Sequence, residues 1–512
     1  MWMVLKIVMY LFGALLVYGL YMFVAKPLYL RYKYGKYKNV FMTEKFHFME
    51  GDFANVTELM NQNKFMCYNY VTQSLDKVGD IWLCMFGSDA YFYCQSVQAI
   101  QELYDNLPNN IDRGKNMLFF LTKLSQDGME IQPSTENWKL RRTTFNKLIG
   151  INHSSKYIPI IVQQMQDMKK LFKKDETVDF SIEAPKIFFN IISKILFGKD
   201  LSENAGLLSY KASDGTIEKM EIGSFFIRVW KDIGESAFHP LTAFVPVLNK
   251  KNLVNPFKRD YNNALEFRRA LKEFLKTTKD AESVYSKLKE DQSLDEDQLF
   301  WDLITFLLGG TDTSAHLISS ALYFIQKNDG CYEKLMNEIN KFFPAAIEDL
   351  KVEDFMKNLE QWDYLNYLLK ECLRLDPPSY ESTDYVTVND VTICGVPIPK
   401  DSWIAVNFMG AHMDPEQWFE PLKFIPERFD PSHEYFKTPD GKNRHPLSYI
   451  PFSAGLRNCP GQSLARLEAK VVLIYLLKHI KYTVEKELLD NDYISFSIIS
   501  QFKLKFKIDS VT

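Results

Sequence analysis

Cys459 lies in a segment whose residue types suit a sulfur that binds a metal centre. The segment, called the cysteine loop, reads Phe452-Ser-Ala-Gly455-Leu-Arg457-Asn-Cys459-Pro460-Gly461. A helix is predicted to begin at Pro460, because proline suits the first helical position. The free N–H groups at the start of that helix favour the thiolate form of Cys459. The pattern therefore predicts an ionised sulfur that can bind a metal.

The other residues of the cysteine loop fit a flat ligand that is bound close to the backbone. Gly455 and Gly461 remove side chains where the chain must pass near such a ligand. Phe452 can shield the sulfur from water, and Arg457 offers a fixed cation for a carboxylate. The alternative is a buried cysteine that merely caps a helix. A nucleophile elbow is excluded, because Pro451 stands where that motif needs glycine.

A second group of polar residues lies inside a long apolar segment. Residues 299–326 predict a helix, interrupted in its middle by Gly309-Gly310-Thr311-Asp312-Thr313-Ser314. Each glycine costs a helix roughly 1 kcal/mol relative to alanine, so a purely structural helix gains nothing from the pair. A local opening beside a small ligand would use both glycines, with Asp312 and Thr313 delivering protons. A kinked core helix is the alternative.

Two further pairs of residues have helical spacing. Glu371 and Arg374 stand three residues apart, and Trp138 and Arg142 stand four apart, so each pair shares one face of a helix. Taken alone, the first pair is typical of a surface ion pair. The second alone is typical of a packed tryptophan beside a solvated arginine.

Together these segments resemble the cytochrome P-450 family. The cysteine loop fits the pattern F-x-x-G-x-R-x-C-x-G at every fixed position, and residues 309–314 fit A/G-G-x-D/E-T-T/S. Glu371 and Arg374 look like the family's E-x-x-R pair. Trp138 and Arg142 look like its W-x-x-x-R helix. The motifs stand in the family's order, and the resemblance covers nearly the whole chain after its N-terminal segment.

The resemblance implies haem b as the cofactor and a role for each matching residue. Cys459 would bind the haem iron, Thr313 would stabilise bound O2, and Asp312 would belong to a proton relay. The other cofactor-binding residues would be Arg457, Trp138, Arg142, Phe452, Gly455 and Gly461. Arg428, in a Pro-Glu-Arg-Phe segment, would complete a structural network with Glu371 and Arg374.

The sequence departs from the family pattern in two places. Only Pro27 stands where a proline-rich hinge usually follows the N-terminal segment. Many members carry an arginine near the position of Tyr385 that binds a haem propionate, and residues 379–386 contain none. We therefore expect propionate binding to depend more on Trp138, Arg142 and Arg457.

The activity that the resemblance implies is that of a haem-thiolate monooxygenase acting on a lipophilic organic substrate. Electrons would come from NADPH through a separate NADPH–cytochrome P-450 reductase, with cytochrome b5 as an additional donor. No G-x-G-x-x-G motif indicates a fused reductase. One alternative is a reductase-independent haem-thiolate isomerase, against which Asp312 and Thr313 argue. The other is a haem-binding sensor without turnover.

The composition limits the remaining classes of protein. The chain has 512 residues, of which 46% are hydrophobic, and this suffices for a large core. A net charge of −4 provides no general attraction for nucleic acid. Seven cysteines without a C-x-x-C pair argue against a disulfide scaffold or a zinc ribbon. They are typical of a reducing compartment.

The N-terminal segment differs from the rest of the chain. Residues 7–24 form an unbroken apolar and aromatic run that approaches the thickness of a bilayer core. Basic residues follow it without an acid before Glu44, which predicts that the remainder stays in the cytosol. We expect residues 1–25 to be an uncleaved single-pass anchor in the endoplasmic reticulum membrane, and residues 26–40 a basic linker. A cleaved signal peptide and a mitochondrial presequence are the alternatives.

Periodicity predicts one large, mainly α domain with minor β-sheets over residues 41–512, in keeping with a cytochrome P-450 fold. Strands are expected at 81–86, 90–93, 493–499 and 502–508, and several short ones at 385–406 around a Gly395-Val-Pro397 turn. Residues 136–380 are expected to be mostly helical, with polar breaks at 202–215 and 279–296. The helix from Pro460 is expected to reach about Lys481.

Three surface and pocket hypotheses complete the prediction. A basic patch for docking the reductase would contain Lys139, Arg141, Lys147, Arg466 and Lys470. Apolar residues 243–248 would dip into the membrane, with an ordinary buried loop as the alternative. The substrate pocket would be lined from residues 117–120, 306–313, 380–385 and 498–502. Such a lining suits fatty acids, sterols and foreign lipophiles equally well.

Overall fold

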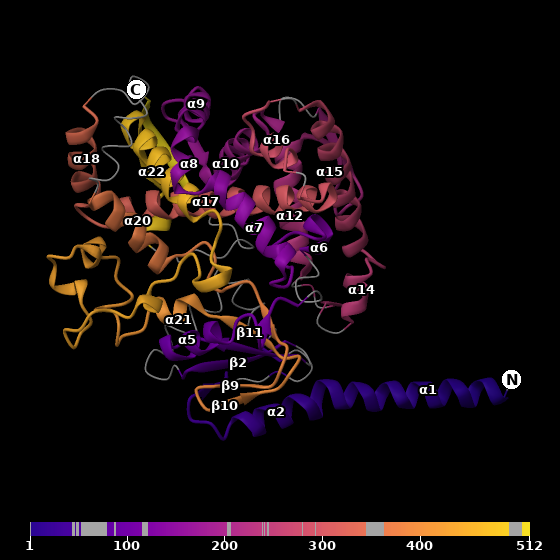
Figure 1. The fold of residues 1–512 in the computed structure, drawn as a ribbon. Coiled ribbons are helices and arrows are strands. Elements are labelled where there is room, and N and C mark those ends of the chain that lie inside the picture. The colour runs from indigo at the N-terminus through magenta and orange to yellow at the C-terminus, as the bar shows by residue number, and fades with distance from the viewer. Residues whose placement is uncertain are drawn as a thin grey trace.

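The structure is a computed structural model in which a large helical region lies against a smaller region of strands (Figure 1). It describes residues 2–43, 47, 51–52, 79–86, 89–114, 121–201, 206–237, 239, 241–242, 245–278, 280–291, 293–344, 363–490 and 504–511. The predicted fold class, mainly α with minor β-sheets, is confirmed.

The helices of the described residues follow in chain order. The N-terminal ones are α1 (Trp2–Leu20), the π-helix η1 (Tyr21–Ala25), α2 (Lys26–Tyr34), α5 (Val97–Asp105), α6 (Thr122–Ser125), α7 (Glu136–Ile149), α8 (Ile151–Ser154), α9 (Ile158–Lys169) and α10 (Phe180–Phe197). The central ones are α12 (Ile222–Ala237), α14 (Pro246–Lys250), α15 (Phe257–Thr277), α16 (Val284–Lys289), α17 (Glu296–Lys327) and α18 (Cys331–Phe342). The last are α20 (Tyr364–Leu375), α21 (Phe408–His412), α22 (Gln462–His479) and α23 (Lys486–Asp490).

The strands form one larger sheet and three small ones. The six-stranded sheet has the order β1 (Val40–Phe41), β2 (Ile81–Phe86), β3 (Asp89–Cys94), β11 (Trp403–Val406), β8 (Tyr385–Thr387) and β4 (Ile111–Asp112). The small sheets are β9 (Val391–Ile393) with β10 (Val396–Ile398), β6 (Leu207–Lys211) with β7 (Ile217–Glu221), and β12 (Ile480–Val484), β13 (Lys505–Val511) and β5 (Thr177–Asp179). The predicted strands at 81–86 and 90–93 are confirmed.

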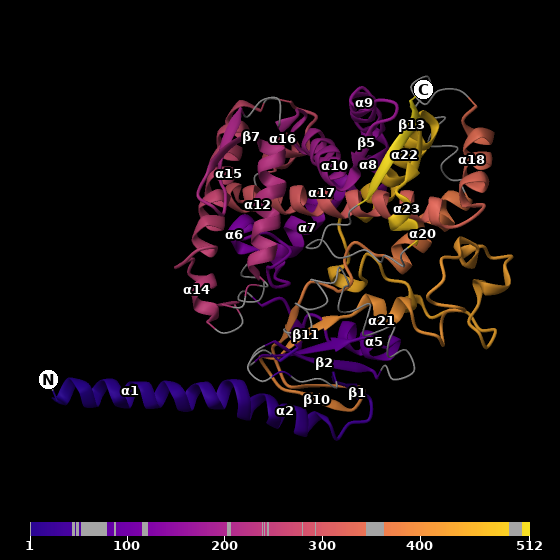
Figure 2. The same cartoon turned by 180° about the vertical axis from the view of Figure 1, so that it is seen from behind.

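Helix α17 runs through the middle of the molecule in both views (Figures 1 and 2). Asp295 caps its first turn by accepting a hydrogen bond from the N–H of Gln298. Apolar side chains on almost every face bury it in the larger core, where it packs along α10 and against α22. Contrary to expectation, the two glycines do not interrupt it. The hydroxyl of Thr313 donates to the carbonyl oxygen of Gly309 at 2.6 Å within the unbroken helix.

Three boundaries differ from the sequence prediction. The turn between β9 and β10 is Cys394-Gly395 rather than residues 395–397, because a two-residue hairpin turn needs two successive positive φ angles, here 47° and 77°. The hairpin of β6 and β7 lies in and beyond a segment predicted as a polar break. Helix α22 begins at Gln462, not at Pro460. The predicted strand at 493–499 lies outside the described residues.

The N-terminal helix projects from the body and is joined firmly to the sheet region. Among the described residues, one helix, from Leu5 to Tyr34, is long and apolar enough to cross a membrane, and its apolar run is not buried in the protein. It therefore includes residues 26–34 of the segment expected as a linker. Tyr34, at its end, is fully buried, donates to the carbonyl oxygen of Pro397 at 3.0 Å and lies edge-on to Phe92.

Candidate active site

Helix α17 keeps one accessible stripe although it crosses the core. Gly309 is exposed, and Asp312 and Thr313 are half-buried. A side-chain carbon added at Gly309 would meet no atom within 4 Å, so open space lies beside the helix at this point. The same carbon at Gly310 would come within 2.9 Å of Ile192 on α10. The first glycine therefore leaves room for a ligand, whereas the second allows two helices to pack closely.

Asp312 lies in an apolar environment that alters its ionisation. Burial raises the pKa of this carboxyl to about 7, and a hydrogen bond from the Trp230 side chain and the charge of His316 partly offset the effect. Trp230 belongs to α12, so a second helix fixes the carboxyl in place. A group with a pKa near neutrality can both donate and accept a proton. Thr313, the next residue, uses its proton on Gly309 and keeps lone pairs that can accept a hydrogen bond.

Part of the expected pocket lining is corrected by the structure. Phe306 is buried and stacks on Phe145 with ring centroids 4.4 Å apart, so its ring faces the packed side of α17. The accessible stripe instead contains Leu308, Gly309, Asp312 and Thr313. Residues 117–120 and 498–502 lie outside the described residues. Residues 380–384 precede β8, and Tyr385 is its first residue. Strand β8 pairs with β11.

The backbone around Cys459 directs N–H groups at its sulfur. Gly461 and Gln462 donate to the sulfur through their backbone N–H groups. Burial raises the pKa of the thiol, while the N–H groups and the guanidinium of Arg142 act in the opposite direction. Gly461 caps α22 and Gln462 is its first residue, so these N–H groups have no partner within the helix. Electrostatic support for a thiolate from a helix start is therefore present, although the helix begins two residues later than predicted.

The glycines and Phe452 define the shape of the cysteine loop. Gly455 has φ +64°, a conformation that favours glycine, and Gly461 would bring a side-chain carbon 3.9 Å from the sulfur of Cys459. The N–H of Cys459 donates to the carbonyl oxygen of Phe452 at 2.8 Å, which closes the loop. The ring of Phe452 lies under the guanidinium of Arg466, 5.1 Å from its centroid.

Arg457 and Trp138 lie together beside the cysteine loop. The guanidinium of Arg457 stacks on the Trp138 ring at 3.8 Å. It donates to the hydroxyl of Ser134 at 2.9 Å and to the carboxylate of Asp112 at 3.2 Å. The indole N–H of Trp138 donates to the carbonyl oxygen of Met129 at 3.0 Å. Both expected cofactor contacts are thus held rigidly by the segment that precedes α7.

Arg142, the third expected cation, is joined directly to the cysteine loop. Its Nη2 donates to the carbonyl oxygen of Asn458 at 2.6 Å and to the side-chain oxygen of the same residue at 2.7 Å. Because Asn458 precedes Cys459, the guanidinium stands beside the sulfur. The structure therefore brings Trp138, Arg142 and Arg457 around one loop.

Arg113 is a further cation that sequence reasoning missed. It follows β4, stacks on the ring of Tyr385 at 3.8 Å and donates to the carbonyl oxygens of Thr383 and Asp384, the latter at 2.6 Å. Its positive charge also contributes to lowering the pKa of Arg457, so the two guanidinium groups are neighbours. Strand β4 pairs with β8, which delivers Arg113 to the segment that lacks an arginine of its own. Only this long-range pairing reveals it.

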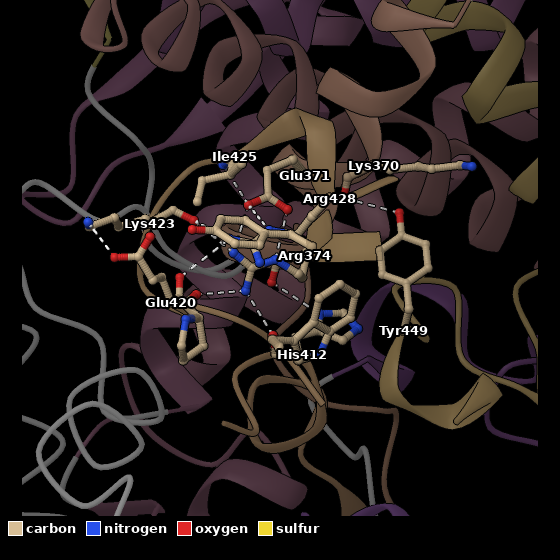
Figure 3. Close-up of polar contacts among 12 residues, drawn as sticks. Lys370, Glu371, Arg374, His412, Glu420, Lys423, Ile425, Arg428 and Tyr449 are labelled. Atoms are coloured by element: carbon tan, nitrogen blue, oxygen red, sulfur yellow. Dashed lines mark hydrogen bonds and ion pairs between the residues drawn. The ribbon is translucent and has the colours of Figure 1, made fainter. Parts of the chain in front are cut away.

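Glu371, Arg374 and Arg428 form the buried network that the motifs predicted (Figure 3). All three side chains are inaccessible to solvent. Arg374 donates twice to Glu371, at 2.8 Å each, and Arg428 donates to it at 2.9 Å. The remaining guanidinium N–H groups reach backbone carbonyl oxygens, including those of His412, Pro421, Lys423 and Phe419. Each charge is thus hydrogen-bonded, which burial requires.

His412 extends this network toward the cysteine loop. Its Nδ1 lies 3.2 Å from the carbonyl oxygen of Arg374, and its Nε2 accepts the N–H of Ile450 at 3.0 Å. The first contact requires a proton on Nδ1 and the second requires none on Nε2, so the ring is neutral. Burial lowers the pKa of His412 to about 3, which agrees with this state. The imidazole therefore joins α20 to Ile450, which lies just before the cysteine loop.

One residue of the expected docking patch is misassigned. Arg141 is buried and forms a bidentate ion pair with Asp302 of α17, at 2.5 and 2.8 Å. It therefore cannot contribute to a surface. Lys139, Lys147 and Arg466 are exposed, and Lys470 is half-buried. The charge of Arg466 contributes to lowering the pKa of Lys370 and of Lys470, mainly an effect of burial, so these three cations are close together.

Comparison with known proteins agrees with this geometry. The sequence model of the family described as Cytochrome P450 matches residues 10–506. The chain belongs to the cytochrome P450 family. Over 490 residues it is 25% identical to the probable cytochrome P450 4p2 of Drosophila melanogaster, covering 90% of this chain and 88% of the relative. Over 432 residues it is 24% identical to cytochrome P450 3A31 of Mesocricetus auratus, covering 80% of each.

Sequence identity to a human relative is higher but extends over a shorter part of the chain. Over 201 residues the chain is 33% identical to human cytochrome P450 4F12. This match spans 36% of the relative and 38% of this chain.

Haem is the cofactor of cytochromes P450, and the observed residues fit it. Open space lies beside Gly309, and Gly461 has no side chain where the backbone passes close to the sulfur. Both features leave room for a flat ring. Arg113, Arg142 and Arg457 supply positive charge for carboxylates. These observations come from separate elements, and all agree with a haem site next to the cysteine loop.

His412 provides a test of the network in this cytochrome P450. We predict that His412→Leu lowers the free energy of unfolding by about 2–5 kcal/mol, because it leaves the Ile450 N–H and the Arg374 carbonyl oxygen buried without partners. Urea denaturation monitored by circular dichroism measures this change. His445→Leu, at an exposed histidine, is the control and should change stability little. Equal stability of the two variants would contradict the role given to His412.

Proposed function

We propose that this cytochrome P450 is a haem-thiolate monooxygenase that inserts one atom of O2 into a lipophilic organic substrate. The observation that carries the proposal is the connection between α17, which contains the accessible stripe, and α22, the helix that follows the cysteine loop. Ser314, which follows Thr313, donates at 2.9 Å to the buried carboxyl of Glu468 on α22, the helix that follows Cys459. The helix that carries Asp312 and Thr313 is therefore in direct contact with the helix that follows Cys459, which supports a site shared by these residues.

The site geometry supports the following proposed cofactor contacts. Cys459 would bind the iron, and Phe452, Gly455 and Gly461 would shape the loop around it. When bound, haem with a thiolate ligand supplies the electron-rich iron chemistry that favours cleavage of O2. The cations that would face the propionates are Arg113, Arg142 and Arg457, with Trp138 beside them. The network of Glu371, Arg374 and Arg428 would hold these elements in register.

Asp312 and Thr313 are the proposed proton-handling residues. The carboxyl of Asp312, with its pKa near 7, would take protons from solvent and pass them inward. The Trp230 hydrogen bond keeps the carboxyl oriented during this exchange. Thr313 would place its hydroxyl oxygen beside O2, where the remaining lone pairs could accept a hydrogen bond. The apolar residues around the stripe would exclude bulk water.

The proposed electron donor is NADPH, acting through a separate NADPH–cytochrome P-450 reductase, with cytochrome b5 as an additional donor. The basic residues left after the exclusion of Arg141, together with the neighbouring Lys370, would receive it. Those left are Lys139, Lys147, Arg466 and Lys470. Lys370, Arg466 and Lys470 are close together, and a group of positive charges attracts an acidic partner over a distance.

The proposed location is the endoplasmic reticulum membrane, with residues 1–25 as the anchor, residues 26–40 as the segment leading out of it and the catalytic domain over 41–512 facing the cytosol. Side chains beside α14 support a second membrane contact. Val245, Val247, Leu253 and Val254 are 40%, 49%, 56% and 38% exposed. Helix α14 lies on the side of the body from which α1 projects (Figures 1 and 2). Residues 243 and 244 of the predicted membrane contact lie outside the described residues.

Turnover with a reductase tests the proposed function. We predict that the purified protein, with NADPH, reductase and a panel of lipophilic compounds, consumes O2 and forms hydroxylated product. Asp312→Asn and Thr313→Ala should reduce product formed per NADPH by about 100-fold, because proton delivery is lost. Cys459→Ser should remove the red-shifted Soret band that a thiolate gives in the reduced carbonmonoxy form, whereas Cys394→Ser should keep it.

Two results would contradict this function. Conversion of a peroxide substrate at full rate without NADPH would identify an isomerase. Normal reduction of the haem without O2 consumption on any compound would identify a sensor.

The basic surface provides a second test. We predict that Arg466→Glu combined with Lys470→Glu slows reduction by the reductase about 10-fold at low salt and weakens its dependence on ionic strength, because attraction becomes repulsion. Stopped-flow measurement of haem reduction checks this. Lys219→Glu, on the distant β7 hairpin, is the matched control. Unchanged reduction by the double variant would exclude this surface.

The segment beside α14 provides a third test. We predict that Val247→Trp, in the full chain reconstituted in vesicles of brominated phospholipid, adds fluorescence that the bromine quenches, because the side chain enters the acyl region. Ile217→Trp is the control, since Ile217 is 68% exposed in the hairpin of β6 and β7, which lies away from α1 (Figure 2). Equal quenching of both variants, or none at position 247, would show that α14 stays in water.

A further inference from the structure

Glu130 is a half-buried carboxylate that lies against helix α17. It lies between α6 and α7, and burial raises its pKa. Thr305 of α17 donates to its Oε2 at 2.6 Å, and Ser125 donates to its Oε1 at 2.7 Å. Within the described residues it makes no ion pair. Its only polar side-chain partners there are therefore hydroxyl groups.

The nearest cation is already engaged by another acid. Arg141 directs two of its nitrogens at the two carboxylate oxygens of Asp302. A third donor, the N–H of Met129, also reaches Asp302 at 2.8 Å. The cluster of Arg141, Asp302 and Glu130 thus contains one basic and two acidic groups. An interior carboxylate that remains in excess is neutralised by a proton or by a positively charged ligand.

Gly128 shows that the position of Glu130 is built into the chain. A side-chain carbon at residue 128 would come within 2.1 Å of the Thr305 hydroxyl and 2.6 Å of the Glu130 carboxylate. Any other residue here would separate the two side chains. The close approach of the segment to α17 therefore depends on glycine at this point.

Glu130 is hydrogen-bonded to the face of α17 that carries the accessible stripe. Residues 305, 309 and 313 recur every four positions, so Thr305 shares a face with Gly309 and Thr313. Both Thr305 and Glu130 remain half-buried, although Met129 and Ile131 on either side of Glu130 are almost fully buried. Eight residues of helix separate Thr305 from Thr313, a distance of about 12 Å.

We propose that Glu130 is a specificity-determining residue that binds the positively charged nitrogen of a lipophilic substrate. The cation would lie beside Glu130, with Thr305 and Ser125 orienting the carboxylate. The apolar part of the substrate would extend along α17, so that a substrate carbon about 12 Å from the nitrogen reaches Thr313. This inference rests on the proposed function, because it places the far end of the substrate at the oxygen-handling residues. It narrows the substrate class from any lipophile to lipophilic amines.

Binding of three matched probes to the holoenzyme tests this proposal. The probes are decyltrimethylammonium, which is cationic and cannot coordinate iron, the neutral 1-dodecanol and the anion dodecanoate. The wild type should bind the cation at least about 10-fold more tightly than the alcohol. Glu130→Gln should remove this preference and leave the affinity for the alcohol unchanged. Affinity for dodecanoate should rise, because a negative charge is lost.

Two readouts and two further variants make the outcomes decisive. The Soret shift reports binding near the haem, and the ligand-induced rise in Tm reports binding whether or not haem or turnover is present. The proposed function can therefore fail without affecting this test. Glu130→Asp keeps the charge and should keep the preference for the cation. Glu136→Gln, at a glutamate whose side chain is 88% exposed, should change nothing.

The overturning results are equally specific. A similar loss of affinity for all three probes in Glu130→Gln would mean that Glu130 only holds the segment to α17. An unchanged preference for the cation in that variant would place the cation elsewhere. A wild type without preference for the cation would refute the proposal directly.

Discussion

Two arginines and one glutamate, all out of reach of solvent, hold the regions of this protein together. Removing three charges from water is unfavourable, and the arrangement is stable only because each N–H and each carboxylate oxygen has a partner. The excess positive charge is spread over carbonyl oxygens from several separate turns. Those turns must therefore keep their positions for the charges to remain satisfied. His412 connects the network to the segment that enters the cysteine loop. The position of this loop therefore depends on the network.

Two other acids in the interior show a different arrangement, because neither is paired with an arginine or a lysine within the described residues. Asp312 relies on an indole N–H and a nearby histidine, and Glu468 on one serine hydroxyl. Burial raises the pKa of the first to about 7 and of the second to about 8. Carboxyls of this kind can exchange protons at neutral pH. The interior of the fold thus contains acidic groups whose charge can change near neutral pH.

The sequence was informative where function is encoded in local spacing. Apolar periodicity placed α17 and the strands β2 and β3, and short motifs placed the cysteine loop and the residues of the arginine network. Spacing failed where the partner is remote. Arg141 looked like a surface residue because Asp302, its partner, lies 161 positions away. Arg113 went unnoticed because its contacts with residues 383 and 384 arise from strand pairing across 270 positions. The β6–β7 hairpin was missed because polar residues alternate with only a few apolar ones on its strands.

The firm junction between the N-terminal helix and the sheet has a mechanical consequence. From Trp2 to Tyr34 the chain is helical, a rod of about 50 Å, and the buried Tyr34 fixes its end against β3 and β10. No proline-rich hinge intervenes. In the proposed membrane-anchored state, a rod attached in this way would act as a lever, so a change of helix tilt in a thicker or thinner bilayer would turn the whole domain with it. The thickness of the membrane would then set the angle at which the catalytic domain faces the bilayer surface.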